Sequence, residues 1–127
     1  MTPHAGLDDR TAYGLLGTFS DIYRQGDIAR LELLLTDDAR SARGGRDSLV
    51  AEYGALFASS ERRRLTVSNV SWLDNGQTAS IIASFEASVV PRRGGRLRLS
   101  RGDLRLDLRM DEGQWRIYRL AHDEHRG

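Results

Sequence analysis

Side chains that can move protons or hold a metal are concentrated at the ends of the chain. The three histidines are His4, His122 and His125, and the last two bracket two carboxylates in His122-Asp123-Glu124-His125. Imidazole and carboxylate groups at such close spacing can ligate a metal. Because this group stands at the chain end, we interpret it as a polar tail and predict no metal site.

The sequence offers no conventional nucleophile. It contains no cysteine, which excludes disulfide bonds and thiolate chemistry within the chain. Serines are present, but no histidine lies in the body of the chain to activate one as a nucleophile. We therefore expect neither a catalytic serine nor a cofactor.

All 19 basic residues are arginines, and 18 acidic residues balance them to a net charge of +1. A guanidinium can bind a carboxylate or phosphate through two parallel hydrogen bonds. The densest basic runs are Arg62–Arg64 and Arg92-Arg93, and acidic residues interleave with the basic ones farther along, at Asp103, Asp107, Asp111 and Glu112. We attribute the arginines to codon usage and ion pairing, and predict no nucleic-acid partner.

The 127 residues suffice for one domain with one hydrophobic core. We predict a single domain over residues 1–127, with an ordered core at about 8–122. No apolar run approaches the ~20 residues of a membrane helix, and the first residues lack a basic-then-apolar secretion pattern. We expect no membrane partner and a cytoplasmic location.

Three amphipathic helices are predicted in the first 60 residues. The first spans about 8–25, because its apolar residues recur with a helical period, Asp8 can cap its start and Gly26 can end it. Asp27 and Asp47 are the expected caps of the second and third helices.

Apolar and polar residues alternate through the second half of the chain, which is typical of long, half-buried strands. In residues 78–90 the inward positions are small except for Phe85, which leaves room above the sheet. Together with the segments near 65–72, 97–110 and 115–122, this pattern predicts a long antiparallel sheet.

Two interruptions of the alternation predict β-bulges, one between Val67 and Val70 and one around Gly102. Bulges bend strands, so the sheet should curl around the helices into a cone whose open end suits a small molecule. A short extended segment at 39–43 precedes the third helix. The predicted fold class is α+β, with three N-terminal helices packed in the concave face of a strongly curved, mainly antiparallel sheet.

Four motifs follow one another over nearly the whole chain. They are Tyr23-Arg24-Gln25-Gly26-Asp27, Thr36-Asp37-Asp38-Ala39, Gly45-Arg46-Asp47 and Gly113-Gln114-Trp115-Arg116-Ile117. The motifs and their order resemble those of the nuclear transport factor two-like superfamily, also called SnoaL-like. The resemblance is greatest to uncharacterised bacterial members of that superfamily. This resemblance implies a cystatin-like cone, commonly a homodimer. Members include isomerases, cyclases, dehydratases, hydrolases, binding modules and assembly domains, so the fold does not decide the function.

The ketosteroid isomerases of that superfamily need a carboxylate base and two acidic hydrogen-bond donors. The resemblance places the corresponding positions at Phe19, Arg43 and Leu104, and none of these side chains can perform those roles. Asp103 and Asp107 are close to the third position but out of phase with the inward leucines, so we expect both to face solvent. We therefore expect no proton-transfer catalysis of this type.

The predicted cone supplies a set of candidate pocket residues, namely Tyr13, Phe19, Arg43, Tyr53, Phe57 and Phe85. Arg43 could hold a carboxylate or phosphate, and the aromatic residues serve equally well as core. The leading hypothesis is a module that binds a small apolar or anionic molecule. Two alternatives remain, a SnoaL-like enzyme (cyclase, isomerase or hydrolase) with non-standard residues, and a homodimerisation or assembly domain that uses Ile82 and Val90 on the outer face of the sheet.

Overall fold

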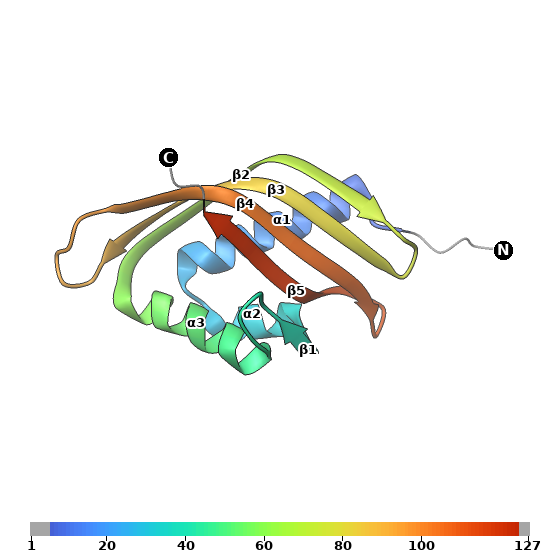
Figure 1. Ribbon diagram of the computed structural model, residues 1–127, viewed down its shortest axis with the longest axis horizontal. Helices are drawn as coiled ribbons and strands as arrows, with labels where there is room; N and C mark the ends of the chain where they lie inside the picture. The colour runs from blue at the N-terminus through green and yellow to red at the C-terminus, as the bar shows by residue number, and fades with distance from the viewer. Residues whose placement is uncertain (1–5, 125–127) are drawn as a thin grey trace.

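The computed structural model describes residues 6–124, which form three helices and five strands (Figure 1). The helices are α1 (Asp9–Gln25), α2 (Ile28–Leu34) and α3 (Arg46–Ser59). The strands are β1 (Leu35–Arg40), β2 (Ser60–Asp74), β3 (Thr78–Pro91), β4 (Arg98–Asp111) and β5 (Gln114–Glu124). No helix in this part of the chain has both the length and the apolar character needed to cross a membrane.

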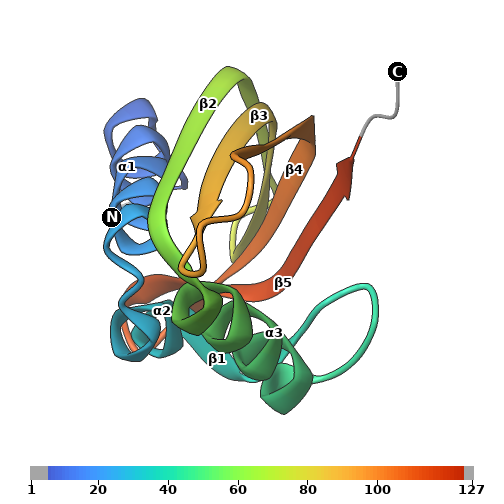
Figure 2. The same ribbon diagram turned by 90° about the vertical axis from the view of Figure 1, so that its left-hand side faces the viewer.

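The strands form one curled sheet in the order β1-β5-β4-β3-β2. Neighbouring strands are antiparallel except for β1 and β5, which are parallel. α1 lies beside β2, and α2 and α3 lie close to β1 at the end of the sheet (Figure 2). The predicted α+β class, with helices first and a curved, mainly antiparallel sheet, is confirmed.

The predicted caps of the first two helices are confirmed. The Asp8 carboxylate accepts a hydrogen bond from the Thr11 amide at 2.8 Å, and the Asp27 carboxylate accepts one from the Arg30 amide at 3.2 Å. Gly26 ends α1 with φ +69° and donates its amide to the Ile22 carbonyl.

The passage from α2 to α3 differs from the prediction. The extended segment is β1, which begins at Leu35, because Leu35, Thr36 and Ala39 bury their side chains while β1 pairs with β5. Asp47 lies inside the first turn of α3 instead of capping it, since the N-cap is Gly45, which has no side chain to accept a hydrogen bond.

Only one of the two predicted bulges is present where it was expected. The β2–β3 register shifts between Ser68 and Ser71, and Asn69 takes φ +52°, which confirms the first. The β3–β4 register continues unbroken through Gly102, so the second prediction is wrong. The apparent change of phase arises because Leu99 is 75% exposed instead of inward-facing. Gly102 serves a different purpose, because a Cβ there would collide with the Asp123 carbonyl of β5.

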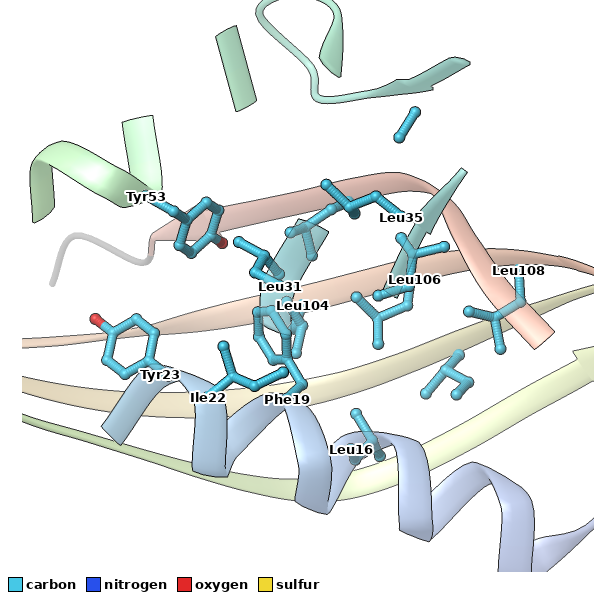
Figure 3. Close-up of a cluster of buried hydrophobic side chains, with 14 of the residues drawn as sticks. Leu16, Phe19, Ile22, Tyr23, Leu31, Leu35, Tyr53, Leu104, Leu106 and Leu108 are labelled. Carbon is cyan, nitrogen blue, oxygen red and sulfur yellow. The ribbon is translucent and has the colours of Figure 1, made fainter. Parts of the chain in front are cut away.

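The core lies between the helices and the concave face of the sheet. α1 contributes Leu16, Phe19 and Ile22, and β4 contributes an inward row of leucines that includes Leu104 and Leu106 (Figure 3). All five side chains are at most 4% exposed. Their burial removes a large apolar area from water and supplies the main stabilisation of the fold.

A single arginine of β2 connects the C-terminal ends of α1 and α3. Arg63 donates from Nε to the Tyr23 carbonyl at 2.9 Å and from Nη1 to the Ser60 carbonyl at 2.9 Å. It also donates to the carbonyls of Arg24 and Phe57, and its guanidinium lies 5.3 Å from the centre of the Phe57 ring. Carbonyls at helix ends have no partner within the helix, so Arg63 satisfies groups that would otherwise lack a donor.

Replacing Arg63 is therefore expected to destabilise the protein. Arg63→Met keeps much of the aliphatic stem and removes every donor, and should lower the free energy of unfolding by about 2 kcal/mol. Urea denaturation followed by circular dichroism measures this change. Arg62→Met is the matched control, because Arg62 is exposed and should change stability by less than about 0.5 kcal/mol. Equal effects of the two variants would contradict the proposed role of Arg63.

Candidate functional site

A cavity of about 520 Å³ opens at one end of the curled sheet. Its apolar surface includes Phe19 of α1, Phe85 of β3 and Leu104 of β4. The inward residues of β3 stay small next to Phe85, as at Ala87, and this leaves the space that larger side chains would fill. A cavity of this size is within the range of small-molecule sites.

Three of the predicted pocket residues, Phe19, Tyr53 and Phe85, line this cavity. Phe19 and Tyr53 meet edge to face with their ring centres 6.3 Å apart. Two of the three positions aligned with the isomerases, Phe19 and Leu104, therefore come together at the cavity, and neither carries a group that can transfer a proton.

The other three predicted residues lie outside the cavity lining. Tyr13 is 54% exposed and packs edge to face on Trp72, with ring centres 5.8 Å apart. Arg43 is exposed in the loop before α3, 3.9 Å from the Glu52 carboxylate. Phe57 is buried beneath Arg63 and contributes to the core.

Two tyrosines bring hydroxyl groups to the cavity from different helices. Tyr23 of α1 and Tyr53 of α3 both line it and are each 8% exposed (Figure 3). Neither hydroxyl makes a hydrogen bond within residues 6–124. Burial is the main cause that raises the pKa of both phenols, so both are neutral hydrogen-bond donors at neutral pH.

The cavity rim carries ionisable groups that the sequence reasoning did not place there. Glu52, Arg98, His122 and Glu124 all belong to the lining. His122 lies within β5, opposite Leu104, and its ring meets Phe85 edge to face at 6.0 Å between ring centres. The interpretation of His122 as part of a polar tail is therefore wrong. The signal that could have placed it is its two-residue spacing from the buried Leu120.

The remaining members of the proposed tail do not form a metal centre in the described part of the chain. His4 and His125 lie outside residues 6–124. Within those residues, no group of three or more metal-capable side chains converges.

The two aspartates near the isomerase position point away from the cavity. Asp103 is exposed on the outward face of β4, as predicted. Asp107 is on the same face but is only 3% exposed, so the expectation that it faces solvent is wrong. Its burial is compensated by hydrogen bonds to its carboxylate, from Ser80 Oγ at 2.7 Å and from Arg105 Nε at 2.9 Å.

No protein-family model matches the sequence, and no curated protein sequence matches it. Solved structures do match. A candidate aromatic ring hydroxylase from Novosphingobium aromaticivorans has a TM-score of 0.82 and 19% identity, over 91% of this chain and 87% of that one. A nuclear transport factor 2-like superfamily protein from Salmonella enterica has a TM-score of 0.76 and 16% identity, over 88% and 87% of the two chains.

A third structural neighbour is named for assembly. It is a candidate calcium/calmodulin-dependent protein kinase II association domain from Xanthomonas campestris, with a TM-score of 0.79 and 13% identity, over 98% of this chain and 95% of that one. These likenesses show a shared fold, and they confirm the predicted resemblance to the nuclear transport factor 2-like proteins at that level.

Tyr53 should make stability depend on pH in the alkaline range. Because its folded pKa is raised above the ordinary 10.0, the unfolded chain releases the proton first. Its contribution is therefore complete below about pH 10 and falls by about 1.4 kcal/mol per pH unit above it. The sequence has no lysine or cysteine to titrate in the same range.

Urea denaturation of the wild type and Tyr53→Phe at about pH 8 and pH 11 measures this effect. The wild type should lose about 1 kcal/mol more stability than the variant between the two pH values. Equal losses would show that Tyr53 ionises alike in the folded and unfolded states.

Proposed function

We propose that this protein binds a small organic molecule in the 520 Å³ cavity. The observation that carries the proposal is the pair of hydroxyls on Tyr23 and Tyr53, which largely buried rings bring to the cavity and which have no hydrogen-bond partner in the described chain. A ligand with an acceptor atom at this position would receive hydrogen bonds that these hydroxyls otherwise give to water.

The cavity surface suggests how such a ligand is oriented. The rings of Phe19 and Phe85 and the side chain of Leu104 offer an apolar surface for its body. Arg98 at the rim has no ion-pair partner among residues 6–124, so it can bind a carboxylate or other anionic end. The chemistry that fits is an apolar molecule with one inward acceptor and, at the mouth, an anionic group.

A second candidate function is acid–base catalysis in the same cavity. The observation that favours it is His122, whose imidazole stands on the lining next to Phe85 and is of the side-chain type most often used as a general acid or base. The neutral phenols of Tyr23 and Tyr53 could stabilise negative charge that develops on a bound oxygen. The structural neighbour named as a candidate hydroxylase is compatible with an enzyme of this fold.

A variant that fills the cavity tests whether the cavity binds a ligand at all. Ala87→Phe places a ring in the cavity, whereas Ser88→Phe places the same ring on the opposite face of β3. The fluorescent probe 1-anilinonaphthalene-8-sulfonate, which combines an apolar body with an anionic group, should bind the wild type and Ser88→Phe alike. We expect Ala87→Phe to weaken that binding at least tenfold, or by about 1.4 kcal/mol.

Equal binding by Ala87→Phe and Ser88→Phe would contradict ligand binding in this cavity. Compounds that raise the melting temperature of the wild type are then incubated with it and analysed by mass spectrometry. Chemical conversion that disappears in His122→Asn while binding remains would favour the catalytic candidate. Unchanged compounds would favour binding alone.

We also propose that the protein forms a homodimer through the outward face of β2 and β3. Leu73 and Ile82 are 66% and 42% exposed there, and Val90, half-buried opposite Arg62, adds a third apolar side chain to this face. The neighbour named as an association domain supports assembly by this fold.

Light scattering after gel filtration at micromolar concentration tests the dimer. The wild type should elute with twice the 14.2 kDa chain mass, and Ile82→Arg should elute as a monomer. Leu33→Arg is the control, since Leu33 is equally apolar and 71% exposed but lies on α2. A wild type that elutes as a monomer would contradict this proposal.

A further inference from the structure

The outward face of the sheet carries a second hollow, of about 830 Å³, at its β1 edge. Residues of β1, β4, β5 and the start of α3 line it, on the same face of the sheet as Leu73 and Ile82 but toward the opposite edge. Five arginines and three aspartates contribute to the lining, so positive groups exceed negative groups by two.

Two of the five arginines are held by carboxylates. Arg105 Nε lies 2.9 Å from the buried Asp107 carboxylate. Arg109 donates two hydrogen bonds to the Asp38 carboxylate, from Nη2 to Oδ1 at 2.8 Å and from Nη1 to Oδ2 at 3.2 Å. These hydrogen bonds are the main cause that lowers the pKa of Asp38 to about 2. These pairs fix two guanidinium groups in place. Of the lining carboxylates, Asp107 also stands opposite Arg119 in the β4–β5 register, and Asp37 is exposed without an ion pair among residues 6–124.

The other three arginines have no carboxylate partner within residues 6–124. Arg40 of β1 and Arg119 of β5 stand directly opposite each other in the parallel register. Arg46 donates one Nη2 hydrogen bond to the Glu32 carbonyl, and its Nε is buried without an acceptor. Like charges placed opposite each other across a sheet repel, and a buried N–H without an acceptor is also unfavourable.

The first turn of α3 adds a further positive element beside Arg46. Gly45 and Arg46 both line the hollow, and Gly45, as the N-cap, offers no side chain to the free amides of that turn. The positive end of the helix dipole therefore lies at the same hollow as the unpaired arginines.

We propose that this hollow binds a phosphate-type oxyanion between Arg40, Arg46 and Arg119. Such an anion supplies oxygen acceptors to planar guanidinium forks and cancels the repulsion between Arg40 and Arg119. Water could accept the hydrogen bonds, but it would leave the repulsion in place. This site is separate from the cavity, on the opposite face of the sheet, so its test is independent of the proposed ligand binding in the cavity.

Inorganic phosphate is the probe. Isothermal titration calorimetry and thermal melts at about pH 7.5 compare phosphate with sodium chloride of equal ionic strength. The wild type should bind phosphate with a dissociation constant below about 10 mM, and Arg40→Gln and Arg119→Gln should each weaken binding about tenfold. Arg62→Gln, which removes an exposed arginine outside the hollow, should change binding less than twofold.

The melts without phosphate give a second, independent readout. Removing one member of the Arg40–Arg119 pair relieves repulsion, so both variants should melt at or above the wild-type temperature in chloride and lose the increase that phosphate gives the wild type. A lower melting temperature in chloride would mean that these arginines already have a partner within the protein. That result, the absence of phosphate binding, or an equal effect of Arg62→Gln would each overturn the proposal.

Discussion

The packing of the helices depends on the guanidinium of Arg63. It binds backbone carbonyls at the ends of α1 and α3, and each of those helix ends would otherwise carry polar groups without donors. One of these carbonyls belongs to Tyr23, so the same group that joins the helices also fixes one of the two phenols at the cavity. Gly26 is part of this arrangement, because a Cβ at that position would collide with the Arg63 guanidinium. The two helices also meet through the ring pairs Phe19–Tyr53 and Tyr23–Phe57, so Arg63 reinforces a contact that borders the cavity.

The sheet has opposite physical properties on its two faces. Its concave face is lined by small residues and leucines, which create an apolar space closed at the bottom by Phe19 and Phe85. Its convex face carries charges whose pairing is incomplete, with Asp107 buried among arginines and Arg40 facing Arg119. Burial of apolar area stabilises the first face, while the second contributes little to stability because exposed ion pairs are weak. Residues on the convex face are therefore free to serve association or anion binding.

Local patterns predicted most of the fold, because capping and alternation involve neighbouring residues. Asp8, Gly26 and Asp27 end or begin helices as their residue types indicate, and alternation located β2 to β5. The contacts that make the site were not predictable in the same way. Arg63 is part of a run of three arginines in the sequence, and only the approach of α1 and α3 distinguishes it from Arg62. His122 looked like part of a tail until the pairing of β5 with β4 placed it beside Leu104 and Phe85.

The parallel pairing of β1 with β5 has a consequence for how the chain acquires its structure. Leu35 pairs with Ile117, so this contact closes a loop of roughly 80 residues and its entropic cost is met only when the last strand is present. On the ribosome, all three helices and most of the sheet are synthesised before β1 has a partner. The buried side chains Leu35 and Ala39 remain without their β5 neighbours throughout that interval. The nascent chain thus depends on β5 to complete the sheet, and a chain interrupted before β5 would expose an unpaired edge of β4 and lack the lining residues His122 and Glu124.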